Sequence, residues 1–330
     1  MNAIASAQIL QPQFGLAAIT PEFAQISLDY ELDTRSAWTR LKPHGRACFT
    51  LGLLNELAKR DKHFKANRHQ GWADGEVFPI EYQVVASGHP GVFNFGGDLA
   101  LFVMLIKARD RQALLDYARA CVVPAWERLC HYDGTATTIS LIEGDALGGG
   151  FECALTSDIL IAEEQARMGF PEILFNLFPG MGAYSILSRR LGAKAAEKMI
   201  SSGELYSARE LKDLGLIDLV VPKGEGRQAV TDYMIENRKR ANGMHGIFRC
   251  REFSNPISFE ELMSICGAWA DAALQLKDRD LRMMQRLVKA QLRQQYEDRQ
   301  AEDRQAQGSA AAVLAKVMNP LAEQVEVEFG

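Results

Sequence analysis

The sequence predicts an α/β fold with a largely parallel sheet and a C-terminal α-helical region. Three observations lead to this prediction. Strand-like apolar runs alternate with helical patterns as far as Pro222, glycine turns join strands to helices, and the chain beyond Pro222 becomes helical and increasingly charged. The 330 residues, of which 47% are apolar, suffice for one large domain with an appendage or for two modest domains with a sizeable core.

Six segments have the β-branched and apolar composition of strands. They are residues 24–30, 36–42, 81–87, 136–143, 158–163 and 216–222. Helical patterns lie between them, so most neighbouring strands are expected to pair in parallel.

Polar residues mark where several helices begin. Asp98 can cap a helix over 99–107, and Asp110 can cap a second helix in which Pro124 predicts a kink or break. Ser207 and Glu210 have the spacing of a capping box. Beyond Pro222, helical patterns cover residues 226–242, 258–276 and 278–300.

These patterns divide the chain into four parts. Residues 1–22 show no periodicity and are expected to be a flexible leader. Residues 23–225 form the α/β core. Residues 226–300 form a helical region that packs on the core or on a neighbouring subunit, and residues 301–330 are a tail without an assignment.

Composition and charge exclude several classes of function. The net charge of -5 is spread along the chain, whereas a nucleic-acid binder concentrates basic charge. No basic residue precedes Arg35, which is unlike a secretory signal, and the longest apolar stretch, 99–106, is too short for membrane insertion. The six cysteines contain no Cys-x-x-Cys pair, as expected of reduced thiols in a cytoplasmic protein. Isolated histidines give no metal site, and we expect no cofactor.

A glycine-rich turn is the most informative segment. A β-branched run ends in Gly148-Gly149-Gly150, and a helix-forming stretch follows. Amides at a helix start carry partial positive charge and can bind a developing oxyanion. A strand-to-helix turn without a ligand explains the same composition. A nucleotide P-loop does not, because no Gly-Lys-Ser/Thr follows. A dinucleotide fingerprint at 180–185 fails too, since no strand precedes it.

Two glutamates stand out among the 42 acidic residues. Glu152 and Glu172 both lie among apolar neighbours that are expected to be buried. A buried carboxyl is costly unless it is protonated or hydrogen-bonded, so a protein that keeps two such groups can use them for proton transfer. The alternative is that each carboxyl faces water at the edge of an element.

The turn before Asp98 offers a second set of amides. Gly96 and Gly97 follow the strand at 81–87 and lead into the helix that Asp98 caps. An outward-pointing amide from this turn would complete a two-donor oxyanion site with Gly149. A capped helix start without a ligand is again the alternative.

Several motifs together resemble a known family. Phe-Asn-Phe-Gly-Gly-Asp-Leu (93–99), Ala-Leu-Gly-Gly-Gly-Phe-Glu (146–152) and Phe-Pro-Glu-Ile-Leu-Phe (170–175) have the order and spacing of the crotonase, or enoyl-CoA hydratase/isomerase, superfamily. The segments at 178–185 and 205–208 are most similar to bacterial diffusible-signal-factor synthases. The resemblance implies a spiral of ββα turns with a C-terminal helical region.

The resemblance also assigns the site. It implies Glu152 and Glu172 as the catalytic pair and the amides of Gly149 and Gly96 as the oxyanion donors, with a one-residue ambiguity in the first turn. Glu143 and Asp145 are interpreted as structural or surface groups. The residues expected to contact substrate are Phe95, Gly97, Gly148, Met181 and Trp269. Met181 and Trp269 are expected to line an acyl tunnel, although Trp269 also fits a core or interface position.

Synthases of this kind imply two reactions on one substrate. A 3-hydroxyacyl thioester of acyl carrier protein loses water, and the cis-2-enoyl thioester is hydrolysed to a free fatty acid that serves as a quorum signal. The resemblance further implies a homotrimer or hexamer and a sensor kinase as a partner. Two other functions stay open: a 2-enoyl-CoA hydratase of fatty-acid degradation, and a crotonase-fold binding protein without catalysis, which would not need the glutamate pair.

Overall fold

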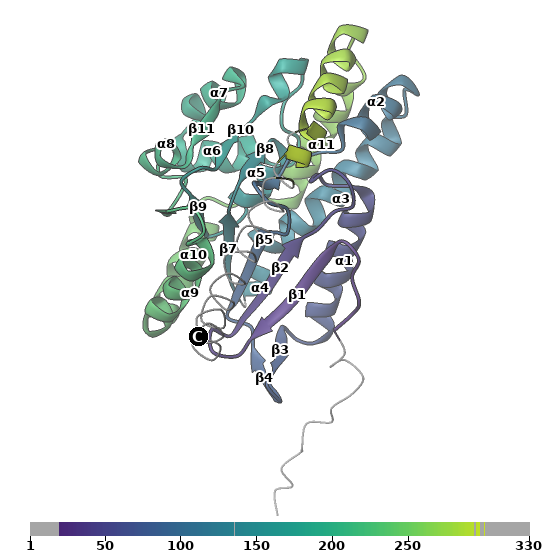
Figure 1. The fold of residues 1–330 in the computed structure, drawn as a ribbon. Helices are drawn as coiled ribbons and strands as arrows, with labels where there is room; N and C mark the ends of the chain where they lie inside the picture. The colour runs from purple at the N-terminus through teal and green to yellow at the C-terminus, as the bar shows by residue number, and fades with distance from the viewer. Residues whose placement is uncertain (1–19, 135, 294, 298–299, 301–330) are drawn as a thin grey trace, which may run out of the picture.

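The computed structural model describes residues 20–134, 136–293, 295–297 and 300. Its main sheet has six strands in the order β1-β2-β5-β7-β9-β12 (Figure 1). β1 is antiparallel to β2, and every other neighbouring pair is parallel. The strands are β1 (Ile26–Glu31), β2 (Ser36–Leu41), β5 (Tyr82–Ser87), β7 (Thr137–Ile142), β9 (Ile159–Glu163) and β12 (Leu219–Val221). The six predicted strands are thus all present.

Helices bury both faces of this sheet. α1 (Leu51–Ala66) and α3 (Arg111–Leu129) cover one face, and α9 (Gly226–Asn237) and α10 (Ala241–Ser254) lie on the other (Figure 1). Side chains alternate along β5, so Val85 packs in the cluster that contains α1 and α3, whereas Val84 packs in the cluster that contains α9. Burial on both faces explains the near-continuous apolar runs in the sequence.

A second, four-stranded sheet has the order β11-β10-β8-β6. Its strands are β6 (Val92–Asn94), β8 (Asp145–Leu147), β10 (Arg167–Gly169) and β11 (Leu205–Ser207). β6, β8 and β10 follow β5, β7 and β9 in the chain, and each leads into a helix: α2 (Leu99–Lys107), α5 (Gly149–Leu155) and the 3-10 helix η2 (Pro171–Phe175). This repeated order is the expected spiral of ββα turns.

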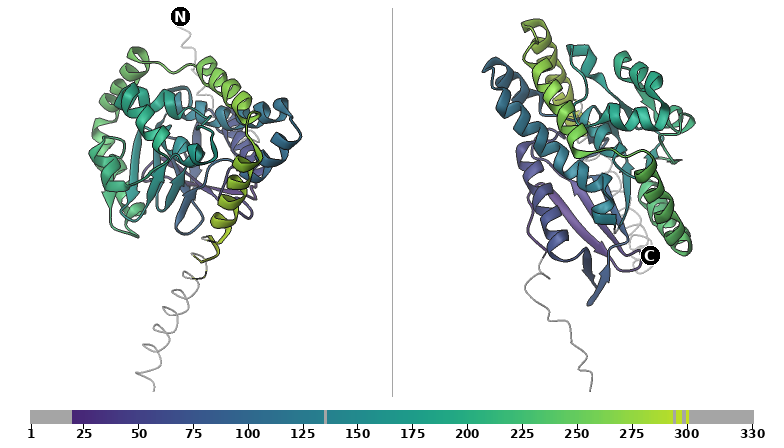
Figure 2. Two further views of the ribbon diagram at one scale, coloured as in Figure 1. Left: turned by 90° about the horizontal axis from the view of Figure 1, so that it is seen from above. Right: turned by 180° about the vertical axis from the view of Figure 1, so that it is seen from behind.

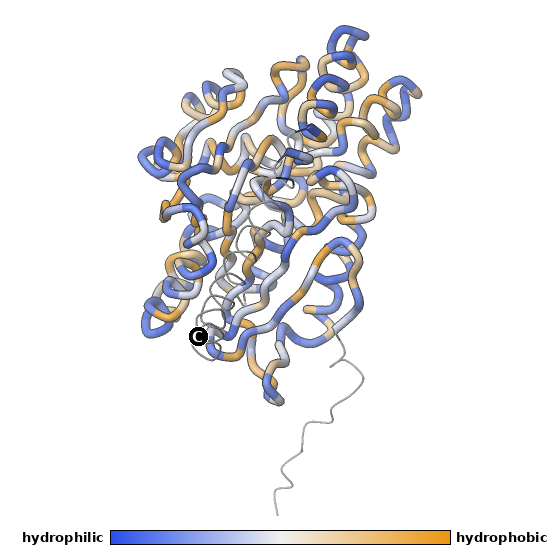
Figure 3. Tube along the Cα trace, in the orientation of Figure 1, coloured by the Kyte–Doolittle hydropathy of each residue, from blue (hydrophilic) through white to orange (hydrophobic). Residues whose placement is uncertain are grey.

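The remaining elements surround these layers (Figure 2). They are the hairpin β3 (Gln70–Ala73) and β4 (Glu76–Pro79), then α4 (His131–Gly134), α6 (Ala183–Leu191), α7 (Ala193–Ser202), α8 (Ala208–Asp213), η3 (Arg238–Arg240) and α11 (Phe259–Ala273). Residues 278–293 form a further helix. Hydrophilic and hydrophobic segments alternate along the peripheral helices, as expected when one helix face contacts the core (Figure 3).

The helix starts confirm the cap predictions, and two helix ends differ from expectation. Asp98 accepts hydrogen bonds at the start of α2, Asp110 does so at the start of α3, and Ser207 opens a complete capping box. Pro124 does not end α3, because packing against α1 and α11 holds the helix on both sides of the missing amide. The helix expected at 226–242 is instead α9 and α10, joined by η3.

Two of the four expected parts of the chain fall largely outside this description. Residues 1–19 of the leader and residues 301–330 of the tail are not among the described residues. In the described part, no helix is both long and apolar enough to cross a bilayer.

Candidate active site

Strand register brings Glu152 and Glu172 together. β8 and β10 are parallel neighbours, with Leu147 opposite Gly169, and the Gly148 amide donates to the Gly169 carbonyl over 2.8 Å. Each glutamate lies in the helix that follows one of these strands. Since both strands end at the same edge of the sheet, the two carboxyls face one cavity.

Two close contacts with neighbouring segments explain why glycine occupies Gly148 and Gly150 in the triple-glycine turn. Gly148 has a φ of 53°, and a Cβ atom there would lie 2.2 Å from Oε1 of Glu172. A Cβ atom on Gly150 would lie 2.0 Å from the carbonyl oxygen of Asn94, in the neighbouring glycine turn. Glycine is therefore required for Glu172 and for the loop after β6 to reach the start of α5.

The cavity has a volume of about 240 Å³ and a largely apolar lining. Of the residues predicted to form the site, all except Gly96 line it: Phe95, Gly97, Gly148, Gly149, Glu152, Glu172, Met181 and Trp269. Trp269 packs edge-on against Phe102 and lies over Gly180. Neither Glu143 nor Asp145 contributes to the lining.

The carboxyl of Glu152 lies at the N-terminus of α6. Its Oε1 accepts from the amides of Met181 (2.8 Å) and Ala183 (2.9 Å), and the residue is 2% exposed. Burial raises the pKa of Glu152 to about 7, although hydrogen bonds from these amides and from Gly182 favour the ionised form.

The carboxyl of Glu172 has a different environment. The residue is partly accessible through the cavity, but its Oε2 atom is buried and accepts no hydrogen bond from the described residues. Burial, followed by the nearby charge of Glu152, raises the pKa of Glu172 to about 8. Because amides donate to Glu152 whereas Oε2 of Glu172 has no partner among the described residues, Glu152 is the carboxyl that more readily ionises.

The first glycine turn corrects one expected oxyanion donor. The Gly96 amide donates to Oδ1 of Asn94 over 2.7 Å, and the Phe95 amide donates to the carbonyl of Ala47 over 2.7 Å. Neither of these N–H groups is available to a ligand. No described residue accepts from the Gly97 amide, which lies beside Gly149. The available pair of donors is therefore Gly97 and Gly149.

Tyr117, which no sequence pattern indicated, holds this turn in place through two hydrogen bonds. Its hydroxyl donates to the carbonyl of Phe49 over 2.5 Å and accepts from the amide of Asp98 over 3.0 Å. Tyr117 lies on a helix distant in sequence from the turn, so no local pattern could have indicated this contact. The helix predicted at 278–300 adds Leu287, Ala290 and Gln291 to the cavity, and their position there was missed for the same reason. Asn94 lies within the motif at 93–99, and its bond to Gly96 depends on how the turn closes.

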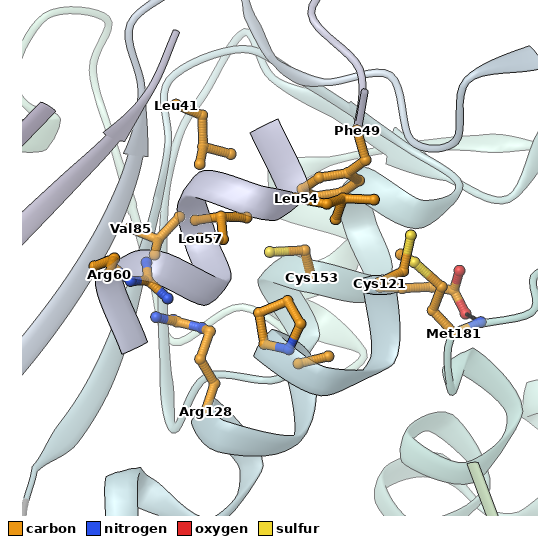
Figure 4. A pocket seen from close by; sticks show the side chains of 13 residues that line it. Leu41, Phe49, Leu54, Leu57, Arg60, Val85, Cys121, Arg128, Cys153 and Met181 are labelled. Atoms are coloured by element: carbon orange, nitrogen blue, oxygen red, sulfur yellow. Dashed lines mark hydrogen bonds between the residues drawn. The ribbon is translucent and has the colours of Figure 1, made fainter. Parts of the chain in front are cut away.

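A second, smaller cavity of about 30 Å³, shown in Figure 4, has Glu152 among its lining residues. Its walls are mainly apolar side chains of α1, α3 and the main sheet, including Leu54, Leu57 and Val85. Cys121, Glu152 and Met181 line both cavities, so they form the partition between them.

The six cysteines are all unpaired thiols, and burial raises the pKa of Cys266, which lies near Glu152, to about 12.

The described residues contain no cluster of His, Cys, Asp or Glu suited to a metal ion. The chemistry that this cavity offers is proton transfer by two carboxyls beside two amides that can stabilise an oxyanion.

Comparison with known proteins places this geometry in a family. The model of the enoyl-CoA hydratase/isomerase family matches residues 81–242. The peroxisomal bifunctional enzyme of Danio rerio is 35% identical over 137 residues, which are 42% of this chain and 17% of that protein. The peroxisomal fatty acid beta-oxidation multifunctional protein AIM1 of Arabidopsis thaliana is 32% identical over 142 residues, 43% of this chain and 19% of that protein. These matches span less than a fifth of the curated relatives.

Solved structures extend the comparison to most of the chain. Pseudomonas aeruginosa DspI has a TM-score of 0.60 and 26% identity, over 73% of this chain and 92% of that chain. An enoyl-CoA hydratase from Bacillus halodurans has a TM-score of 0.63 and 19% identity, over 79% of this chain and 98% of that chain, and supports the fold alone. From its fold and motifs, and from these similarities, the chain belongs to the crotonase superfamily of enoyl-CoA hydratases and isomerases.

Proposed function

We propose that this protein dehydrates a 3-hydroxyacyl thioester of acyl carrier protein and hydrolyses the product to a free cis-2-unsaturated fatty acid, which acts as a quorum signal. The observation that carries this proposal is the meeting of Glu152 and Glu172 in one apolar cavity beside two available amides. The choice of a signal synthase within the superfamily is supported by the motifs at 93–99 and 178–185 and by the similarity to DspI.

Dehydration requires a base and an acid on the same substrate. One carboxylate takes the proton from C2, and the thioester oxygen becomes an enolate oxyanion that the Gly97 and Gly149 amides stabilise. The C3–O bond then breaks, and the other carboxyl, in its protonated form, gives its proton to the departing hydroxyl so that water leaves. The different pKa values of Glu152 and Glu172 provide one ionised and one protonated group near neutral pH.

Hydrolysis uses the same groups at C1. Water attacks the thioester carbon while a carboxylate removes a proton from that water, and the resulting oxyanion lies on the same two amides. The C–S bond breaks, the thiol leaves with a proton from the acid, and the free enoic acid remains. One oxyanion site can therefore serve both steps, because each step places negative charge on the same oxygen.

A 2-enoyl-CoA hydratase is the second proposal, and the two curated relatives favour it. Both are multifunctional peroxisomal enzymes, and one is named for beta-oxidation. A hydratase would use the same carboxyls and amides but would release its product still bound to coenzyme A.

The two proposals are distinguished by incubating the purified protein with the 3-hydroxydodecanoyl thioesters of acyl carrier protein and of coenzyme A. Mass spectrometry of the products should show free cis-2-dodecenoic acid from the carrier-protein substrate and none with Glu172→Gln. Absence of free acid, together with rapid hydration of crotonyl-CoA, would reject the synthase and support the hydratase.

We further propose that the chain forms trimers or dimers of trimers. Apolar side chains that are well exposed on α9 and α10 support this: Ile235 (56%), Ile247 (61%) and Phe253 (73%). Light scattering during size-exclusion chromatography should give the mass of three or six chains, and a monomer at micromolar concentration would contradict the proposal.

A further inference from the structure

The helix at 278–293 closes one side of the active-site cavity. Leu287, Ala290 and Gln291 line the cavity from one face of this helix, as expected for residues three and four positions apart. Leu287 and Ala290 continue the apolar lining, whereas Gln291 adds a carboxamide. This helix belongs to a charged stretch of sequence in which no motif singles out that glutamine.

The carboxamide of Gln291 has no hydrogen-bond partner among the described residues. The residue is 9% exposed, and its Oε1 atom is buried without a partner in the part of the chain that the structure describes. No described residue bonds its Nε2 atom either. A buried acceptor left unpaired destabilises a folded protein, so a protein that keeps one at a cavity has a reason other than stability.

Gln295, one helical turn further along, behaves differently. Its Oε1 accepts from the Ala47 amide over 3.1 Å, and its Nε2 lies 2.7 Å from the Gly45 carbonyl oxygen and 3.2 Å from Nδ1 of His89. Gln295 therefore attaches the helix to the loop before α1, and Gln291 is not needed for that attachment. The two residues form a matched pair, one with partners in the protein and one without.

Two of the other polar side chains at the cavity already have hydrogen-bond partners in the protein. The Tyr117 hydroxyl is bonded to Phe49 and Asp98, and Oε1 of Glu152 is bonded to the start of α6. Glu172 also has an oxygen without a partner among the described residues, but it is a titratable group whose pKa burial raises to about 8. Of the side chains that the described residues bring to the cavity, Gln291 carries the one carboxamide, which stays neutral at every pH of interest.

We propose that Gln291 is a substrate-recognition residue whose Oε1 accepts a hydrogen bond from an O–H or N–H group of the bound thioester. This inference rests on the proposed use of a thioester substrate. Two parts of such a substrate carry the required donor: the 3-hydroxyl of the acyl chain and the amides of the pantetheine arm. The acyl chain itself has no donor without its 3-hydroxyl.

The test measures binding to full-length protein in a Glu172→Gln background, in which turnover does not disturb the equilibrium. The ligands are 3-hydroxydodecanoyl-CoA and dodecanoyl-CoA, which share the pantetheine arm and differ in the hydroxyl. Gln291→Met, which keeps an unbranched side chain without the acceptor, should weaken binding about tenfold. Weaker binding of the hydroxylated ligand alone would assign the hydrogen bond to the 3-hydroxyl. Equally weakened binding of both ligands would assign it to the pantetheine arm. Unchanged affinity for both ligands would overturn the inference.

Thermal unfolding provides a second readout with the matched control. Gln291→Met should raise the melting temperature because it removes an unpaired buried acceptor, whereas Gln295→Met should lower it and leave the preference between the two ligands unchanged. A lower melting temperature in Gln291→Met with no change in affinity would mean a purely structural glutamine. Wild-type protein that binds both ligands but releases no free acid would reject the proposed function and leave the result for Gln291 intact.

Discussion

Glu152 lies within α5, and Asp158 follows the same helix in the chain, yet these two buried carboxyls have opposite surroundings. Asp158 accepts from Nε2 of His131 (2.8 Å), from the amide of Thr138 (3.0 Å) and from Arg251. Burial alone would raise its pKa, but the hydrogen bond from His131, that residue's charge and the Thr138 amide hold the pKa of Asp158 below its usual value.

Among the described residues, no such cation acts on Glu152 or Glu172. Their largest influence is burial, which raises both pKa values, and the charge of Glu152 raises that of Glu172 further. Comparison of the two regions shows that burial by itself does not make a carboxyl reactive. A carboxyl that forms ion pairs with histidine and arginine is held in its charged form and stabilises the fold. Two neighbouring carboxyls without an ion-pair partner can instead exchange protons near neutral pH.

The largest expected effect is the loss of activity when either site glutamate is replaced. Glu152→Gln and Glu172→Gln keep side-chain size but remove proton transfer, so each should lower kcat by about 10²–10⁴-fold in assays of thioester turnover. Glu164→Gln serves as a control, because Glu164 is an exposed carboxyl that pairs with Arg209 at the surface. If both site variants turned over verified substrate at the wild-type rate while remaining folded, the assignment of the pair would be wrong.

Substitution of the paired carboxyl should affect stability instead. Asp158→Asn removes the carboxylate that His131 and Arg251 share, although His131 keeps its ion pair with Glu252, and should lower the free energy of unfolding by about 1–3 kcal/mol in urea titrations. Because the folded pKa of Asp158 is lowered, its contribution is present above its unfolded pKa and is lost as pH falls through the folded value. A change below roughly 1 kcal/mol would show that the pairing contributes little.

The pH dependence of turnover tests whether Glu152 and Glu172 ionise at different pH values. Dehydration needs one glutamate ionised and the other protonated, so kcat/KM should rise as Glu152 ionises near pH 7 and fall as Glu172 loses its proton near pH 8. Glu152→Gln removes the neighbouring charge and should lower the pKa of Glu172. A rate that is flat from pH 5 to 9, with chemistry shown to limit it, would contradict this arrangement.

The sequence predicted these features to the extent that they are local. Gly148 to Glu152 form one continuous motif, and the caps at Asp98 and Ser207 depend on residues within one helical turn. Short strands such as β6, β8 and β10 were missed, because three residues are too few to show a periodicity.

Longer-range features needed the fold. The donor in the first turn was misplaced by one residue, since the bond between Asn94 and Gly96 depends on how the turn closes. Tyr117 and Gln291 reach the site from distant helices, so their positions follow from packing rather than from a pattern. Glu172 was singled out by its apolar neighbours and given its role by the family motif, while its contact with the start of α5 depends on the register of β8 and β10.

The smallest expected effect concerns the partition between the two cavities. Met181 binds Glu152 through its backbone amide, so Met181→Ala keeps that bond while opening a path to the small apolar cavity. We expect the preference for longer acyl chains to increase about fourfold for each methylene that becomes buried. Competition assays with thioesters of different length measure this, and Met104→Ala, at an exposed methionine, is the control. An unchanged length preference would mean that the partition does not limit the chain.

The contrast between unpaired and paired carboxyls is tested most directly by carbon-13 NMR titration of the side-chain carboxyls in the unliganded protein, with Glu152→Gln, Glu172→Gln and Asp158→Asn used to assign the resonances. We expect Glu152 and Glu172 to titrate well above the usual glutamate value, with Glu152 first, and Asp158 to titrate below the usual aspartate value. Ordinary titration of both glutamates near pH 4, at about the reference value for an exposed glutamate, would contradict it.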